Sequence, residues 1–170
     1  WLIDITPDFR QQIKLIQDSI NSIIPCGIFL THAHSGHYTG LLEFGREVMN
    51  SNNIPIYVMP QMKIFLENNN PWKQLIQQGN IRLIEMDDRK KIPLNDKISV
   101  SPFLVPHRSE ISETVGFKIK GNNSSIIYIP DIDSWDEWEI NLTELVEDND
   151  ILFIDGTFYH EEELKDRDID

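Results

Sequence analysis

Apolar residues in the first half of the chain follow two alternating patterns. Continuous apolar runs of about five residues predict strands at 1–5, 27–31, 54–59 and 81–86. Between them, apolar residues at helical spacing predict helices at 6–21, 39–49 and 60–68. Strand and helix therefore alternate through this half, which is typical of a sheet covered by helices.

The first of these helices has clear start signals. Thr6 is suited to the N-cap, Pro7 to the first helical position, and Asp8 interacts favourably with the helix dipole. We expect the helix to run to residue 19 or 21. One apolar face follows from the spacing of Phe9, Ile13, Ile16 and Ile20.

The second half of the chain is richer in strands. Residues 98–105, 114–120 and 125–129 are β-prone runs separated by turn-forming residues, and the last two predict a hairpin. A short helix at 141–147 and a buried strand at 151–154 complete the pattern. Consecutive strands after an alternating half predict an α/β sandwich rather than one doubly wound sheet.

Composition and charge narrow the class of protein. A chain of 170 residues with 40% hydrophobic and 25% charged residues suits one globular domain, here 1–170. Acidic residues outnumber basic ones by 28 to 15, and the net charge of −13 opposes non-specific binding to nucleic acid or anionic lipid. A local basic patch is still compatible with this charge. We expect a small-molecule substrate and no membrane partner, and leave the oligomeric state open.

The single cysteine and the first residues of the chain indicate the cellular compartment. Cys26 has no intramolecular partner for a disulfide, which suits a reducing compartment. The first residues lack the basic start and long apolar stretch of a secretory signal, so we expect a cytoplasmic protein. Because the chain begins abruptly in a strand, we also expect it to be an excerpt of a longer protein.

Three of the five histidines lie within six residues, directly after the apolar run 27–31. In an extended segment His32 and His34 project to the same side, and His37 can approach them where the chain turns. Neutral imidazole is the commonest protein ligand for zinc. The alternative is a polar loop that happens to be rich in histidine. The residues that follow favour the metal site.

Two further residues stand directly after predicted strands. His107 follows the run that ends at 105, and Asp131 follows the run that ends at 129. Taken singly, an aspartate after a strand is more often a turn former. Taken together, several imidazoles and one carboxylate form a plausible shell for a divalent metal with an open position. Zinc is the expected ion, with iron and manganese as alternatives.

This order of residues resembles the metallo-β-lactamase superfamily. The resemblance covers nearly the whole chain and is closest to the branch that includes coenzyme PQQ biosynthesis protein B. It is carried by the His-X-His-X-X-His run at 32–37, by His107 and Asp131 at strand ends, and by the surrounding segments. These segments are 30–34, 37–41, 105–108, 113–117, 129–133 and 155–159.

The resemblance implies a four-layer αββα sandwich, incomplete here at both ends, with metal ligands at one edge of two sheets. It implies that His32, His34 and His107 hold a first metal, that Asp131 bridges two metals, and that His37 serves the second. In most members a metal-bound hydroxide attacks an ester, amide, thioester or phosphodiester. The resemblance assigns no other catalytic residue, and the sequence holds no Gly-rich phosphate loop for a nucleotide cofactor.

The chain departs from the superfamily pattern in two places. Gly36 stands where most members have an aspartate that serves the second metal, which puts a dinuclear centre in doubt. The superfamily also supplies a later histidine, and His160 follows the strand at 151–154 too soon to match it, so we interpret it as a surface residue. Asp155 is either a turn former or a residue that orients a ligand histidine.

Three functions are compatible with these residues. The first is a metal-dependent hydrolase of an ester, amide or phosphodiester. The second is a mononuclear iron oxygenase, as the resemblance to coenzyme PQQ biosynthesis protein B suggests. The third is a non-catalytic member that keeps the fold and binds metal, which Gly36 favours.

Overall fold

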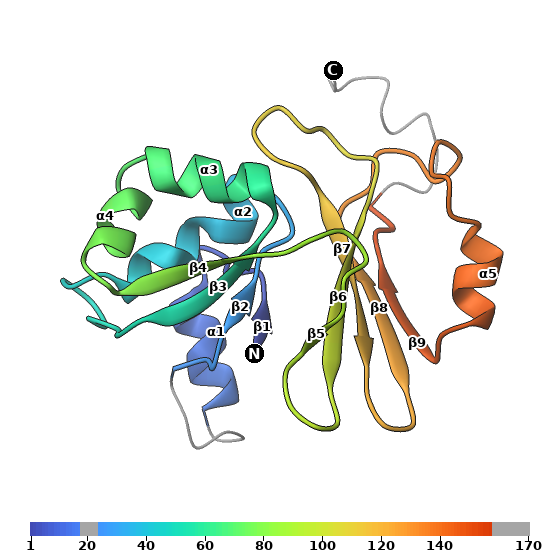
Figure 1. Ribbon diagram of the computed structural model, residues 1–170, viewed down its shortest axis with the longest axis horizontal. Helices are drawn as coiled ribbons and strands as arrows, with labels where there is room; N and C mark the ends of the chain where they lie inside the picture. The colour runs from blue at the N-terminus through green and yellow to red at the C-terminus, as the bar shows by residue number, and fades with distance from the viewer. Residues whose placement is uncertain (18–23, 158–170) are drawn as a thin grey trace.

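Two β-sheets lie face to face in the computed structural model, which describes residues 1–17 and 24–157 (Figure 1). The first sheet has four strands, and every neighbouring pair in it is parallel. Parallel pairing requires a crossover between strands, and the helices of the first half provide these crossovers. In spatial order the strands are β1 (Leu2–Ile3), β2 (Ile28–Phe29), β3 (Ile54–Val58) and β4 (Ile81–Glu85).

The second sheet has five strands in sequence order. Its neighbours are antiparallel except the last pair, β8 and β9, which is parallel. The predicted hairpin is confirmed, because β7 pairs with β8 from Phe117 opposite Tyr128 to Lys120 opposite Ser125. The strands are β5 (Ile92–Pro93), β6 (Ser99–Leu104), β7 (Val115–Lys120), β8 (Ser125–Ile129) and β9 (Ile151–Ile154).

Helices cover the outer faces of both sheets (Figure 1). The first sheet is covered by most of them, and α5 (Leu142–Glu147) lies against the second. This arrangement confirms the predicted αββα sandwich of the metallo-β-lactamase type. None of the helices in the described part of the chain is long and apolar enough to span a bilayer. The helices on the first sheet are α1 (Phe9–Ile16), α2 (Ser35–Tyr38), the 3₁₀ helix η1 (Thr39–Phe44), α3 (Pro60–Asn68) and α4 (Trp72–Gln77).

The core is divided by the sheets into three clusters. The largest joins the first sheet to its helices, and includes Ile56, Leu41 and Phe44, none of which is exposed. A second cluster fills the space between the sheets, where Phe29 meets Phe117 edge to face with ring centroids 5.6 Å apart. A third packs the outer face of the second sheet against the α5 side. Apolar contact between the sheets therefore fixes the relative position of their strand ends.

Several elements differ from the prediction. The first helix starts at Phe9, where the Thr6 hydroxyl and carbonyl accept from Asp8 N and Phe9 N, and its predicted end lies outside the described residues. The predicted helix 39–49 is correct only in part: residues 39–44 form the 3₁₀ helix η1, directly after the short α2, and the chain leaves helical geometry at Gly45. The sequence analysis also did not predict α4 or the two-residue β5.

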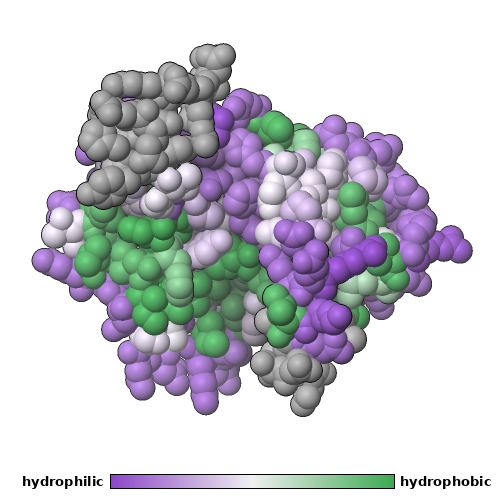
Figure 2. All heavy atoms as spheres, turned by 180° about the vertical axis from the view of Figure 1, so that it is seen from behind, coloured by the Kyte–Doolittle hydropathy of each residue, from purple (hydrophilic) through white to green (hydrophobic). Residues whose placement is uncertain are grey.

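The strand predicted to be buried at 151–154 is exposed. Ile151, Phe153 and Ile154 are 45%, 58% and 41% exposed, because β9 is an edge strand of the second sheet. Seen from behind, hydrophobic surface lies on the half of the molecule that the second sheet forms (Figure 2). An apolar run predicts burial but does not tell whether the strand has neighbours on both sides.

Gly40 and Gly36 provide a matched test of packing beside the histidine loop. A Cβ at Gly40 would lie 2.3 Å from the Thr6 carbonyl oxygen and 2.7 Å from Ile5 Cγ1, whereas a Cβ at Gly36 meets nothing within 4 Å. We expect Gly40→Ala to lower the free energy of unfolding by about 2–4 kcal/mol and Gly36→Ala to change it by less than about 1 kcal/mol. Chemical denaturation of both variants measures this, and equal effects would contradict the packing described here.

Candidate metal centre

The predicted donors lie where strands of both sheets end at the same edge. His32 and His34 follow β2 in the first sheet, while His107 follows β6 and Asp131 follows β8 in the second. Because β6 and β8 run in the same direction in the antiparallel sheet, their carboxyl ends meet at one edge. The backbone N of Val115 donates to the Thr31 carbonyl and joins the two sheets at this point.

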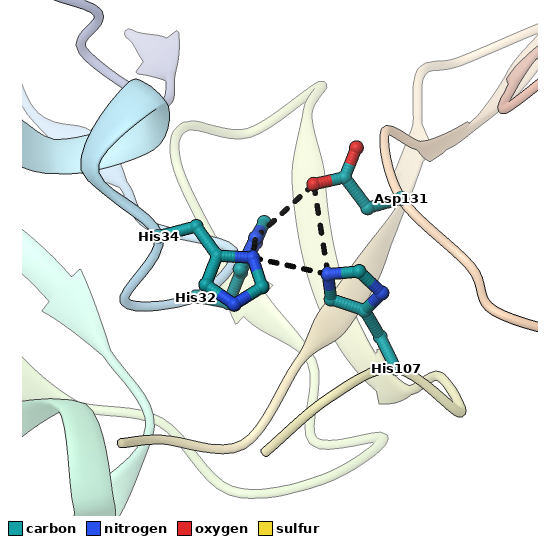
Figure 3. A group of neighbouring side chains, drawn as sticks. All are labelled: His32, His34, His107 and Asp131. Carbon is teal, nitrogen blue, oxygen red and sulfur yellow. Dashed lines mark hydrogen bonds and ion pairs between the residues drawn. The ribbon is translucent and has the colours of Figure 1, made fainter. Parts of the chain in front are cut away.

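Four side chains converge on one point (Figure 3). The donor atoms of His32, His34, His107 and Asp131 all lie within 4.8 Å of one another. His34 Nδ1 lies 2.9 Å from His32 Nε2 and 3.1 Å from His107 Nε2. Asp131 Oδ2 lies 3.1 Å from His32 Nε2 and 3.9 Å from His107 Nε2. The structure therefore brings together the four residues that the sequence analysis placed around one metal.

These separations match the size of a small divalent cation. Nitrogen and oxygen ligands at about 2.0–2.1 Å from zinc in a tetrahedron lie roughly 3.3 Å from each other. The four separations given above, 2.9–3.9 Å, bracket that value, and all pairs of donor atoms lie within 4.8 Å. A three-histidine, one-carboxylate set is also a donor set that zinc or iron accepts. The residues present therefore fit a divalent metal.

The outward nitrogen of His32 has a hydrogen-bond partner that fixes its proton. Its Nδ1 lies 2.9 Å from the Thr31 hydroxyl oxygen, and that hydroxyl donates to Asp4, whose carboxylate oxygens lie 2.8 and 3.0 Å away. Because the hydroxyl proton is directed to Asp4, its oxygen accepts the Nδ1 proton of His32. The Nε2 lone pair is then free to face the centre.

For the other two ligand histidines, a carboxylate fixes the proton on the outward ring nitrogen. Asp133 Oδ1 accepts from His107 Nδ1 at 2.7 Å, and Glu110 Oε2 lies 3.5 Å from His34 Nε2. Both partners favour a proton on the outward nitrogen of each ring, which leaves the inward nitrogen as a lone pair. Three lone pairs and a carboxylate thus face one point, an arrangement that a cation stabilises.

His37 stands beside this group and bridges two carboxylates. Its Nδ1 lies 2.7 Å from Asp4 Oδ2 and its Nε2 3.1 Å from Asp131 Oδ2. Burial favours the neutral ring, but hydrogen bonds to Asp131 and Asp4 outweigh it and raise the pKa of His37 to about 9. His37 is therefore an imidazolium here, and its role as a ligand of a second metal stays a prediction.

The same contacts set the charge of the neighbouring groups. The His32 and His37 rings, each with Nε2 3.1 Å from Asp131 Oδ2, hold the pKa of Asp131 far below its usual range, so this carboxylate is ionised. Burial lowers the pKa of His32 below its usual 6.5, against the opposing effect of Asp131. A neutral His32 and an ionised Asp131 are the protonation states that metal binding requires.

The loop that carries His107 is attached to the first half of the chain. The Ser112 hydroxyl accepts from the backbone N of Ala33 at 2.9 Å, beside the two donor histidines. Glu113 accepts from the backbone N of Gln61 at 3.0 and 3.1 Å, at the start of α3. These bonds hold the loop of His107, which follows a strand of the second sheet, close to His32 and His34, which follow a strand of the first sheet.

The other predicted residues have more limited roles. Asp155 accepts from the backbone N of Ile132 at 3.2 Å and from both the N and the hydroxyl of Thr157. It therefore forms a turn that also supports the segment between Asp131 and Asp133. Gly36 lies in α2 and has open space where a side chain would project. His160 lies outside the described residues.

Asp4, Asp133 and Glu110 contact the histidines but were not predicted as site residues. Asp4 could have been found, because it follows the strand β1, which is parallel to β2 and ends at the same edge. Asp133 could have been found as the next acidic residue after Asp131, two positions along the chain. Glu110 belongs to an irregular loop, for which the sequence pattern gives no position.

The sequence profile of the beta-lactamase superfamily domain matches residues 1–169, so the chain belongs to this family. Its fold is similar to that of zinc-bound PqqB from Methylobacterium extorquens, with 20% sequence identity and a TM-score of 0.74 over 96% of this chain and 58% of PqqB. The predicted likeness to the branch that includes coenzyme PQQ biosynthesis protein B is thereby supported. No curated protein sequence shows a significant match.

Two other solved structures share the fold with lower TM-scores. A diphosphatase from the PhnP family is 23% identical, with a TM-score of 0.52 over 78% of this chain and 49% of that one. The short form of human tRNase Z is 16% identical, with a TM-score of 0.51 over 78% of this chain and 58% of that one. The chain thus spans about half the length of these structures, and the similarity concerns the fold alone.

Asp133 can be tested through metal affinity. Removing the partner of a ligand histidine typically weakens metal binding by about 10–100-fold. We expect Asp133→Ala to lower zinc affinity by about that factor, and Asp133→Asn, which keeps an accepting oxygen, to lower it less. Competition with a chromophoric chelator measures the affinity. Asp136→Ala, an exposed neighbour, is the control, and an equal loss in the control would contradict a specific contact with His107.

His37 should make the stability of the metal-free protein depend on pH. A pKa raised from 6.5 to about 9 stabilises the folded state fully below pH 6.5, and this contribution is lost as pH rises through 9. We expect the stability difference between the wild type and His37→Gln to shrink by at most about 3 kcal/mol across this interval. Denaturation in the presence of a chelator from pH 6 to pH 10 measures it. A difference independent of pH would show that His37 is not charged.

Proposed function

We propose that this chain is the metal-binding part of a hydrolase that acts on an ester, amide or phosphodiester bond of a small-molecule substrate. The observation that carries the proposal is the convergence of three imidazole lone pairs and the Asp131 carboxylate on one point. Zinc can expand from these four donors to a fifth position, at which a water molecule would bind, whereas a purely structural zinc site stays closed at four ligands.

Some residues at this centre would bind the metal, and others orient the metal-binding side chains. His32, His34, His107 and Asp131 would hold the cation. A bound divalent cation supplies Lewis acidity, which lowers the pKa of a water molecule and polarises the scissile group. Thr31, Asp133 and Glu110 keep the protons on the outward nitrogens of the rings.

The solved relatives support hydrolysis as the class of reaction. Two of the similar folds are described as a diphosphatase and as tRNase Z. Both names denote cleavage of a phosphorus–oxygen bond. Because these proteins share only the fold with this chain, they support the reaction class but do not identify the substrate.

An iron-dependent oxidation is the second candidate. Gly36 favours it, because glycine offers no side chain to a second metal. A mononuclear centre with three histidines and one carboxylate can hold iron(II) and leave positions for dioxygen. The two candidates share the same four donors and differ in the metal and in the second reactant.

Metal content and activity test the proposal together. We expect the protein purified without chelator to contain about one zinc or manganese ion per chain, and His32→Ala and His107→Ala to lose the metal and at least ~100-fold of any esterase or phosphodiesterase activity. Elemental analysis and a panel of chromogenic esters and phosphodiesters measure this. Asp136→Ala serves as the control and should keep both.

Two outcomes would contradict hydrolysis. Stoichiometric metal without turnover of any panel substrate would favour a non-catalytic member. Oxygen uptake after anaerobic loading with iron(II), abolished in His107→Ala, would favour the oxidative alternative instead.

A further inference from the structure

A hollow lined by lysines lies at the end of the second sheet opposite the metal centre. It encloses about 260 Å³ between the loop joining β5 to β6 and the loop joining β7 to β8, at the lower end of the sheet in Figure 1. His107 follows the other end of β6, so roughly 20 Å separate the two places. The hollow is therefore distinct from the donor cluster. Its polar lining includes Lys91, Lys97, Lys120, Ser99, Asn122 and Asp96.

The register of strands β5, β6 and β7 places residues of the hollow side by side. Ser99 on β6 is the partner of Lys120 on β7 and of Pro93 on β5, so the three residues project from the same face. Ser99 is only 7% exposed, and its short side chain leaves space between the lysines. Lys118, two residues before Lys120 on β7, extends the same face. The sheet backbone thus fixes the positions from which the ammonium groups extend.

The lysines of the hollow have no acidic partners. Among the residues that the structure describes, Lys91, Lys97 and Lys120 form no ion pair, whereas Lys63 pairs with Glu85 and Lys90 with Asp87. Asp96 is the one carboxylate in the lining, against three ammonium groups. In a chain of net charge −13, three of the nine lysines therefore gather unpaired in one place. A bound anion would find more positive than negative charge in this lining.

We propose that this hollow binds a phosphate group of a small ligand. Lysine ammonium groups act as point charges toward phosphate, and the Asn122 amide and the Ser99 hydroxyl can add hydrogen bonds to its oxygens. The volume of about 260 Å³ is slightly below the roughly 300–1,000 Å³ of typical ligand pockets, which suits a single phosphate-bearing group. A long polyanion is disfavoured by the net charge of −13 of the whole chain.

We would titrate the whole protein with phosphate and record ¹H–¹⁵N spectra, which show the backbone amides near which phosphate binds. Phosphate replaces chloride at constant ionic strength. We expect saturable shifts of the amides at 91–99 and 120–122, with a dissociation constant of about 1 mM, because exposed charge pairs contribute little. Saturation of these amides with phosphate, and its absence with chloride, would support the hollow as a phosphate site.

Matched double variants separate the hollow from general charge. Lys97→Gln with Lys120→Gln should weaken phosphate binding at least about tenfold. Lys14→Gln with Lys73→Gln removes the same charge from exposed lysines elsewhere and should leave the binding unchanged. Equal weakening in both pairs would overturn the proposal.

Two further results would also overturn it. Shifts confined to the amides near His32 and His107 would place phosphate at the metal centre. A single-stranded oligonucleotide that binds these lysines more tightly than inorganic phosphate would identify a nucleic-acid surface instead.

Discussion

The buried carboxylate of Asp4 is the interaction on which the histidine loop depends. It accepts hydrogen bonds from the backbone N and hydroxyl of Thr31 and interacts with His37, while only 7% of the residue is exposed. Its backbone has a φ of 58°, in the left-handed region that aspartate tolerates better than most residues. This turn at the end of β1 directs the side chain across to the loop after β2. One acidic group thereby orders both His32, through Thr31, and His37.

The sequence predicted the layers and the four converging donors for a common reason. Each donor stands directly after an apolar strand, and strands of a sandwich end at shared edges, so a position in the sequence translates into a position in space. His107 and Asp131 are far from His32 in the sequence, yet β6 and β8 bring them within hydrogen-bonding distance of the histidine loop. Strand ends were thus sufficient to assemble the centre.

Other features depend on contacts that the residue pattern does not encode. Residues 39–49 have helical spacing, but the close approach of Gly40 to Thr6 accompanies a tighter 3₁₀ turn. The apolar strand β9 is exposed because burial depends on neighbouring strands, and β9 forms the edge of its sheet. Glu110 and Ser112 belong to an irregular loop, where neither periodicity nor capping defines a direction. Tertiary contacts decide in each of these cases.

The contact of Glu113 with α3 has a mechanical consequence. His107 shares its loop with a carboxylate held by the first turn of a helix on the first sheet, while the ring itself belongs to the second sheet. A sliding movement of one sheet over the other would therefore stretch this loop and move one of the three imidazoles relative to the other two. Because its ligands come from both sheets, the geometry of the centre depends on how the two sheets pack against each other.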